Sequence, residues 1–89
     1  MTRYDVSFVG RVQGVFFRAT AVEVARGFDV AGWVRNEPDG SVRCVVEGEP
    51  EELDRFVAAV EEAKRENVQD VTITRAIATG EFTGFSIRR

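Results

Sequence analysis

The chain has 89 residues, of which 44% are hydrophobic and 30% charged, and it carries a formal net charge of −3. This balance is typical of a folded domain with one core, so we expect a single domain over residues 1–89. The negative charge disfavours nucleic-acid binding through a basic face. No apolar run approaches the roughly 20 residues of a membrane helix, and the first residues lack a signal-peptide pattern. We therefore expect a cytoplasmic protein that binds neither a membrane nor nucleic acid.

Two features of the composition limit the chemistry. The sequence has no histidine, which excludes a Ser–His or Cys–His couple and a histidine-ligated zinc site. Its one cysteine, Cys44, excludes an internal disulfide and is compatible with a reducing cytosol. Cys44 lies in an alternating apolar pattern, which favours core packing over a nucleophilic role. We expect neither a metal nor a cofactor.

The first half of the chain alternates between strand and helix patterns. Residues 3–8 alternate polar and apolar side chains, as in a half-buried strand. Apolar residues between Ala21 and Phe28 then recur at helical spacing, and Gly27 is suited to the end of that helix. Residues 31–36 and 42–47 are two further strand patterns, separated by a Pro-Asp-Gly turn that predicts a hairpin.

The second half contains one more helix pattern and two more strand patterns. Pro50 is suited to the first position of a second helix, whose apolar stripe runs from Leu53 to Val60. A fourth strand pattern ends at Ile77, and a short fifth strand is predicted at residues 85–87. The order β-α-β-β-α-β, with one extra strand, predicts an α+β, ferredoxin-like (split β-α-β) sandwich. In it, two helices pack on one face of a four- to five-stranded antiparallel sheet.

One segment between the first strand and the first helix points to chemistry: Gly10-Arg11-Val12-Gln13-Gly14-Val15-Phe16-Phe17-Arg18. Glycines let backbone N–H groups approach a ligand closely, and a guanidinium at the start of a helix adds a second set of donors. Together they suit one small anion such as a phosphate. Turn geometry alone also explains the glycines, and a solvated or salt-bridged side chain also explains Arg18. The helix macrodipole opposes a cation there unless an anion is bound, which favours the anion site.

This segment, followed by Gly32-Trp33-Val34-Arg35-Asn36, Asp39-Gly40-Ser41-Val42 and the ending Phe85-Ser86-Ile87-Arg88, resembles the acylphosphatase family over nearly the whole chain. The resemblance implies metal-independent hydrolysis of the carboxyl–phosphate bond of a small acyl phosphate, giving a carboxylate and inorganic phosphate. It implies that Arg18 binds the phosphate and that Asn36 orients the attacking water. By position, the phosphate cradle is the backbone of Gly10, Arg11, Val12, Gln13, Gly14, Val15 and Phe16.

The residue types suit these roles, because phosphoryl transfer needs positioning and charge stabilisation more than covalent chemistry. An amide such as that of Asn36 can accept a hydrogen bond from water and donate one to an oxygen, although turn formation alone also explains an asparagine here. Gln13 is suited to bracing the loop through its amide. One of the adjacent Phe16 and Phe17 is expected in the core and the other at the site, and Trp33 is expected to serve packing.

Two positions depart from the family pattern. Ala21 stands where members commonly carry threonine, and Lys64–Val68 replaces a Gly-Pro turn that we place away from both catalytic segments. Two other functions fit parts of the sequence. The first is a non-catalytic anion-binding or regulatory module with the same fold. The second is an RNA-binding domain that stacks bases on Tyr4 and Phe8, which the net charge disfavours. A monomer is expected.

Overall fold

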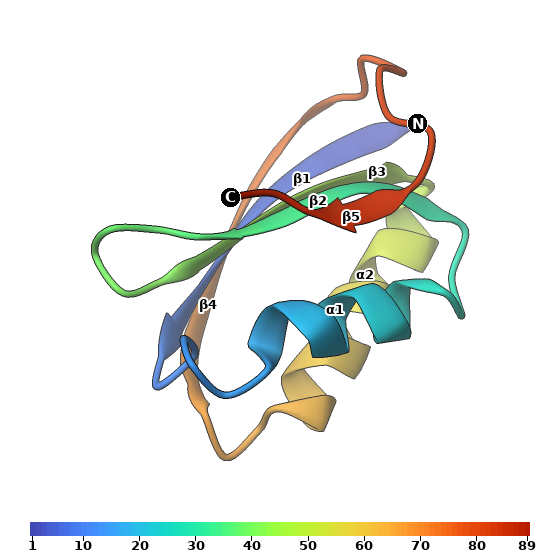
Figure 1. Ribbon diagram of the computed structural model, residues 1–89. Helices are drawn as coiled ribbons and strands as arrows, with labels where there is room; N and C mark the ends of the chain where they lie inside the picture. The colour runs from blue at the N-terminus through green and yellow to red at the C-terminus, as the bar shows by residue number, and fades with distance from the viewer.

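Five strands and two helices make up the computed structural model, which describes residues 1–89. Their order along the chain is β1 (Thr2–Gly10), α1 (Phe17–Ala25), β2 (Val30–Asn36), β3 (Val42–Gly48), α2 (Pro50–Ala63), β4 (Val68–Ile77) and β5 (Phe85–Ile87). This order confirms the predicted one, including the helix start at Pro50 and the short terminal strand. Both helices lie on one face of the sheet, which gives the expected ferredoxin-like α+β fold (Figure 1).

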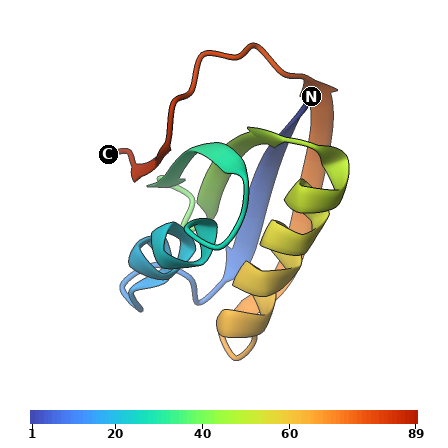
Figure 2. The same cartoon turned by 90° about the vertical axis from the view of Figure 1, so that its right-hand side faces the viewer.

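The five strands form one sheet in the order β4-β1-β3-β2-β5. The four strands β4, β1, β3 and β2 are antiparallel to their neighbours, as predicted. The prediction of an antiparallel sheet is wrong for β5, which pairs in parallel with β2. The reason is the path of the chain: residues 78–84 cross the end of the sheet where β2 begins, so β5 runs in the direction of β2 (Figure 2).

The core lies between the sheet and the helices. Every second side chain of β1, from Tyr4 to Phe8, is buried there together with the apolar stripe of α2 from Leu53 to Val60, as its spacing predicted. Cys44 is also buried in this core. Because Tyr4 and Phe8 are buried beneath the helices, they cannot stack on a nucleic-acid base, which argues against RNA binding by these side chains. Neither helix combines the length and apolar character needed to cross a bilayer.

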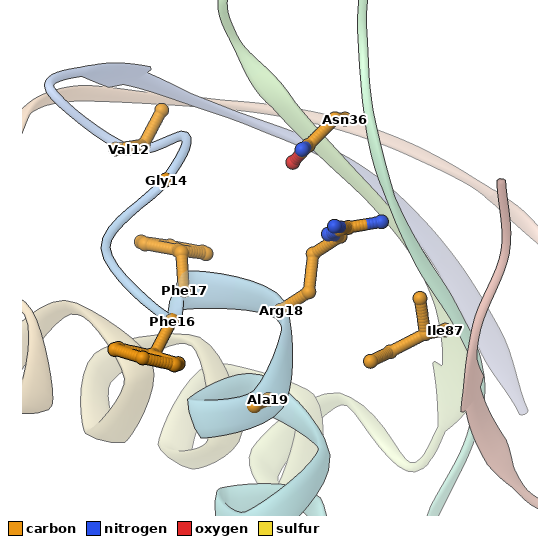
Figure 3. A pocket seen from close by; sticks show the side chains of 8 residues that line it. All are labelled: Val12, Gly14, Phe16, Phe17, Arg18, Ala19, Asn36 and Ile87. Carbon is orange, nitrogen blue, oxygen red and sulfur yellow. The ribbon is translucent and has the colours of Figure 1, made fainter.

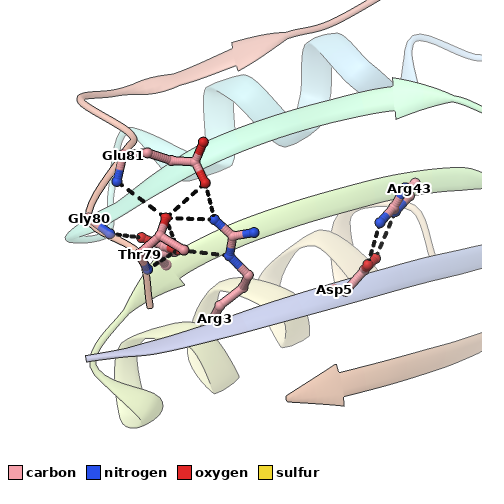
Figure 4. A network of polar contacts seen from close by, with 7 residues as sticks. Arg3, Asp5, Arg43, Thr79, Gly80 and Glu81 are labelled. Carbon is pink, nitrogen blue, oxygen red and sulfur yellow. Dashed lines mark hydrogen bonds and ion pairs between the residues drawn. The ribbon is translucent and has the colours of Figure 1, made fainter. Parts of the chain in front are cut away.

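The opposite face of the sheet is covered by arginines rather than by helices. Trp33 is only 7% exposed, because the guanidinium groups of Arg35, Arg43 and Arg88 lie over its ring at 4.9, 5.5 and 4.7 Å from the centroid. Such cation–π contacts shield the indole while the charged heads stay in water. Trp33 therefore packs as expected. Arg43 is held in place by a paired hydrogen bond to Asp5 (Figure 4).

Strand register brings the two segments with the family resemblance together. Val42 of β3 pairs with Phe8 of β1 on one side and with Asn36 of β2 on the other. The ends of β1 and β2 therefore lie at the same end of the sheet, with one strand between them. The loop that leaves β1 at Gly10 opens beside Asn36 for this reason.

Candidate active site

A pocket lies where the loop after β1, the first turn of α1 and the ends of β2 and β5 meet (Figure 3). Its lining residues are Val12, Gly14, Phe16, Phe17, Arg18, Ala19, Asn36 and Ile87. Arg18 and Asn36, which are 18 positions apart in the chain, thus share one small hollow and point toward one another across it. The two side chains that the resemblance selected are brought together by the fold.

The loop from Arg11 to Phe16 presents a run of free backbone donors. The N–H of Arg11 donates to the carbonyl oxygen of Asn67 at 3.0 Å, but no protein group accepts a hydrogen bond from the N–H groups of residues 12–16. Backbone donors in folded proteins are nearly always paired with protein or water. A run of unpaired N–H groups in a loop that leads into a helix is the arrangement that binds anions.

Glycine is required at one end of this loop for a steric reason. Gly10 has a φ of 136°, and a Cβ placed on it would overlap the carbonyl oxygen of Asn67. This close approach lets Asn67 hold the N–H of Arg11 and so fixes where the loop leaves the sheet. Gly14 has a φ of 75° with open space around it, so its requirement is conformational only.

Phe16 links the loop to α1 in a strained conformation. Its φ of 61° and ψ of 25° are left-handed, which is uncommon for a bulky residue, and its side chain is 83% exposed. Phe17 is instead buried in the core, which answers the question left open by the sequence. Unfavourable backbone conformations that persist beside a pocket are typical of functional sites. Here the turn at Phe16 leads directly into the first residues of α1, which line the pocket.

Arg18 has no counterion within the protein. It lies in the first turn of α1, is half-buried, and makes neither an ion pair nor a side-chain hydrogen bond. The first turn of α1 contains no acidic residue, so the guanidinium and the helix N-terminus add their positive charge without compensation. The side-chain amide of Asn36 is equally free of protein partners. Both groups are available to a bound anion and its water.

Two side chains hold the loop from opposite sides. The amide nitrogen of Gln13 donates to the carbonyl oxygens of Glu37 at 2.7 Å and Ser41 at 2.9 Å, which confirms the expected brace. The Nζ of Lys64 donates to the carbonyl oxygen of Val15 at 2.6 Å. The expectation that residues 64–68 lie away from the catalytic segments is therefore wrong. β4 begins beside Gly10, so the segment between α2 and β4 lies next to the loop and Lys64 reaches Val15, a proximity that no local pattern encodes.

The predicted cradle residues divide by what their side chains do. Val12 is buried and lines the pocket, whereas Val15 packs against the core without lining it, so both anchor the loop. Gly10 and Gln13 do not line the pocket either. Arg11 is exposed and does not line the pocket. Ile87, 41% exposed, is a pocket residue that sequence reasoning missed, and its only signal was an apolar residue in the last strand. Ala21 is buried in the core, away from the pocket lining.

Comparisons with known proteins identify the same family over nearly the whole chain. The family model described as Acylphosphatase matches residues 4–87. The acylphosphatase of Salinibacter ruber is 44% identical over 88 residues, which cover 98% of this chain and 93% of that protein. The acylphosphatase of Methylococcus capsulatus is 40% identical over 90 residues, which cover 100% of this chain and 98% of that protein. The crystal structure of acylphosphatase from Bacillus subtilis superposes with a TM-score of 0.89 at 34% identity and covers 100% of both chains.

These matches span both segments that form the pocket, and they extend from β1 to β5. Relatives of nearly the same length share the activity in their names, and a solved member of the group has the same fold. Sequence, fold and pocket therefore lead to one conclusion: the chain belongs to the acylphosphatase family.

Proposed function

We propose that Arg18, Asn36 and the backbone of Gly10–Phe16 carry the acylphosphatase activity of this chain. The reaction is the hydrolysis of the carboxyl–phosphate bond of a small acyl phosphate, which yields a carboxylate and inorganic phosphate. The observation that carries the assignment is the unpaired guanidinium of Arg18, which faces the unpaired amide of Asn36 beside a run of free N–H groups.

In this mechanism the loop and Arg18 bind the phosphoryl group. The planar guanidinium grips two phosphoryl oxygens, and the N–H groups of residues 12–16 bind the remaining negative charge. Charge spreads over the equatorial oxygens in the transition state, so fixed donors aimed at them stabilise it. The helix N-terminus at Phe17 acts on the same charge.

Asn36 orients the water that attacks. Its carbonyl oxygen accepts a hydrogen bond from the water, and its amino group donates to a phosphoryl oxygen. The water oxygen forms a bond to phosphorus while the bond from phosphorus to the acyl oxygen breaks, and the electron pair leaves with the carboxylate. The water proton passes to the product phosphate or to solvent. A carboxylate is a good leaving group, so the mechanism assigns no strong general base, in keeping with the lack of histidine.

The proposal also covers the setting of the reaction. We propose that the chain acts as a monomer in the cytoplasm and uses no metal. No three His, Cys, Asp or Glu side chains gather in an arrangement that could hold a metal ion. Nothing in the structure or in the comparisons favours the non-catalytic module over the enzyme.

The test is hydrolysis of an aromatic acyl phosphate, measured as released phosphate in excess chelator. Arg18→Ala is expected to abolish turnover and to weaken inhibition by inorganic phosphate. Asn36→Ala is expected to lower kcat by about 10²-fold or more while phosphate still inhibits, since the water loses its partner whereas the phosphate keeps Arg18 and the loop N–H groups. Arg26→Ala is the matched control, because Arg26 lies at the other end of α1 and pairs only with Glu23 on the surface.

Three outcomes contradict the proposal. Turnover by Arg18→Ala at the wild-type rate would show that the phosphate is bound elsewhere. Tight phosphate binding without hydrolysis of any acyl phosphate tested would assign the chain to the non-catalytic alternative. Loss of turnover in the presence of chelator, restored by a divalent cation, would refute the metal-independent mechanism.

A further inference from the structure

The side chain of Gln13 crosses from the phosphate loop to the hairpin that carries Asn36. Its one amide nitrogen donates both hydrogens, to the carbonyl oxygens of Glu37 and Ser41. These two residues are the two ends of the β2–β3 turn, and they also pair with each other through the Glu37 N–H and the Ser41 carbonyl at 2.9 Å. Glu37 directly follows Asn36 in the chain. Gln13 thus grips the hairpin one residue beyond the side chain that orients the water.

No other hydrogen bond joins the loop to this hairpin. The other two anchors of the loop lie on the side of β4 and α2: the Arg11 N–H on the Asn67 carbonyl and the Lys64 ammonium on the Val15 carbonyl. Beyond Gly10 the chain has left the strand ladder, so sheet pairing no longer sets its position. Val12 and Val15 anchor the loop to the core, and Gln13 is the hydrogen-bonded link that sets its distance from Asn36.

We propose that Gln13 is a positioning residue that sets the attack distance by fixing the phosphate loop against the Asn36 hairpin. The inference rests on the proposed function, in which the loop holds the phosphoryl group and Asn36 holds the water. Reacting atoms must lie about 3–3.5 Å apart in line, and misplacement by about 1 Å can lower a rate by about 10²-fold. Loss of the Gln13 bridge leaves each half of the site intact and alters only their separation.

Lys64 affects phosphate binding rather than the attack distance. In a trans peptide the carbonyl of Val15 and the N–H of Phe16 point in opposite directions. Because the Lys64 ammonium holds that carbonyl on the side of α2, it turns the Phe16 N–H the other way. Loss of Lys64 should therefore weaken phosphate binding, whereas loss of Gln13 should slow the chemical step. Variants of Gln13 and Lys64 can therefore be compared as controls for each other.

The experiment compares Gln13→Met, which keeps the length of the side chain and removes both donors, with Lys64→Met. We expect Gln13→Met to lower kcat by about tenfold or more with KM and the inhibition constant of inorganic phosphate within about threefold of wild type. We expect Lys64→Met to raise both of those constants with a smaller change in kcat. Gln69→Met makes the same chemical change at the other glutamine, which is exposed and makes no hydrogen bond, and should behave as wild type.

A second measurement separates positioning from general disorder of the loop. In an Asn36→Ala background no oriented water remains to be positioned, so adding Gln13→Met should change kcat by less than about twofold, a strong departure from additivity. Gln13→Leu also removes the donors without adding charge, and it serves if the methionine variant does not fold. Unchanged kcat in folded Gln13 variants, or a full additional loss in the Asn36→Ala background, overturns the inference. Wild-type turnover by Asn36→Ala would instead refute the proposed function itself.

Discussion

Replacing Glu47 by glutamine should lower the free energy of unfolding at neutral pH by about 3 kcal/mol. Glu47 is 4% exposed on the face of the sheet away from the helices. Its carboxylate accepts hydrogen bonds from the Nε of Arg3 at 2.8 Å, the N–H of Thr79 at 2.8 Å, the hydroxyl of Thr79 at 3.2 Å and the N–H of Gly80 at 3.0 Å. The three donor residues are labelled in Figure 4. These contacts fasten the segment that crosses from β4 to β5.

The magnitude follows from the pKa of this carboxyl. Burial by itself raises the pKa of Glu47, but the hydrogen bonds from Thr79, Arg3 and Gly80 outweigh it and lower the pKa from 4.5 to about 2. One pKa unit is worth about 1.4 kcal/mol, so the ionised form stabilises the fold by about 3 kcal/mol. Because the folded pKa lies below the unfolded one, this stabilisation is fully present above about pH 4.5. It is lost as the pH falls toward 2.

Urea unfolding followed by far-ultraviolet circular dichroism between pH 7 and pH 2 measures both effects. Wild type should lose stability as the pH falls through this window, and Glu47→Gln should lack that part of the slope. Glu81→Gln is the control, because its carboxylate also pairs with Arg3 but is 58% exposed, so solvent screens it and the change should be much smaller. Amide hydrogens of β5 should also exchange faster in Glu47→Gln. Parallel pH profiles of Glu47→Gln and wild type would refute the reasoning.

Three further predictions concern the loop and the core. Gly10→Ala should lower the free energy of unfolding in urea by more than about 2 kcal/mol, and Gly14→Ala by only about 1 kcal/mol. Both residues have a positive φ, but only Gly10 lies against the Asn67 carbonyl, so equal losses would contradict this reasoning. Phe16→Asn should raise the free energy of unfolding by up to about 1 kcal/mol, because asparagine tolerates the left-handed conformation and the exposed ring contributes little packing. A lower free energy of unfolding would show instead that the ring packs against the protein. Burial raises the pKa of the Cys44 thiol, so a thiol reagent at pH 8 should label Cys44 only after denaturation, and rapid labelling of folded protein would contradict this.

Local patterns were sufficient to predict most of the fold. The alternation around Val6, the helical stripe ending at Val60 and the proline at position 50 each match the structure, because burial of one face imposes a period of two on strands and about 3.6 on helices. The direction of β5 did not follow from its own residues. The residues of a three-residue strand do not indicate at which end of the sheet the preceding segment crosses, and that crossing sets the direction of the strand.

Some residues of the site were predicted from the sequence, and others became evident only from the fold. Arg18 was predicted at an anion site from the loop and the helix start, and the resemblance added Asn36 as its partner. The structure places both across one pocket, although their catalytic roles stay predictions. Lys64 and Ile87 were not found, because each comes from a distant element that packs against the loop or the pocket. Gln13 was expected to brace the loop, but its partner, the hairpin after Asn36, became evident only from the fold.

The sequence by itself determined the alternation of elements, the composition of the core, the lack of histidine chemistry and the presence of a glycine-bearing loop that ends in an arginine. Only the tertiary structure decided that Arg18 has no counterion, that Phe16 rather than Phe17 is exposed, and that Glu47 holds the path to β5. The physical reason is that local periodicity reports which face of an element is buried. Whether a charged group is paired, by contrast, depends on what every other element brings within a few ångströms of it.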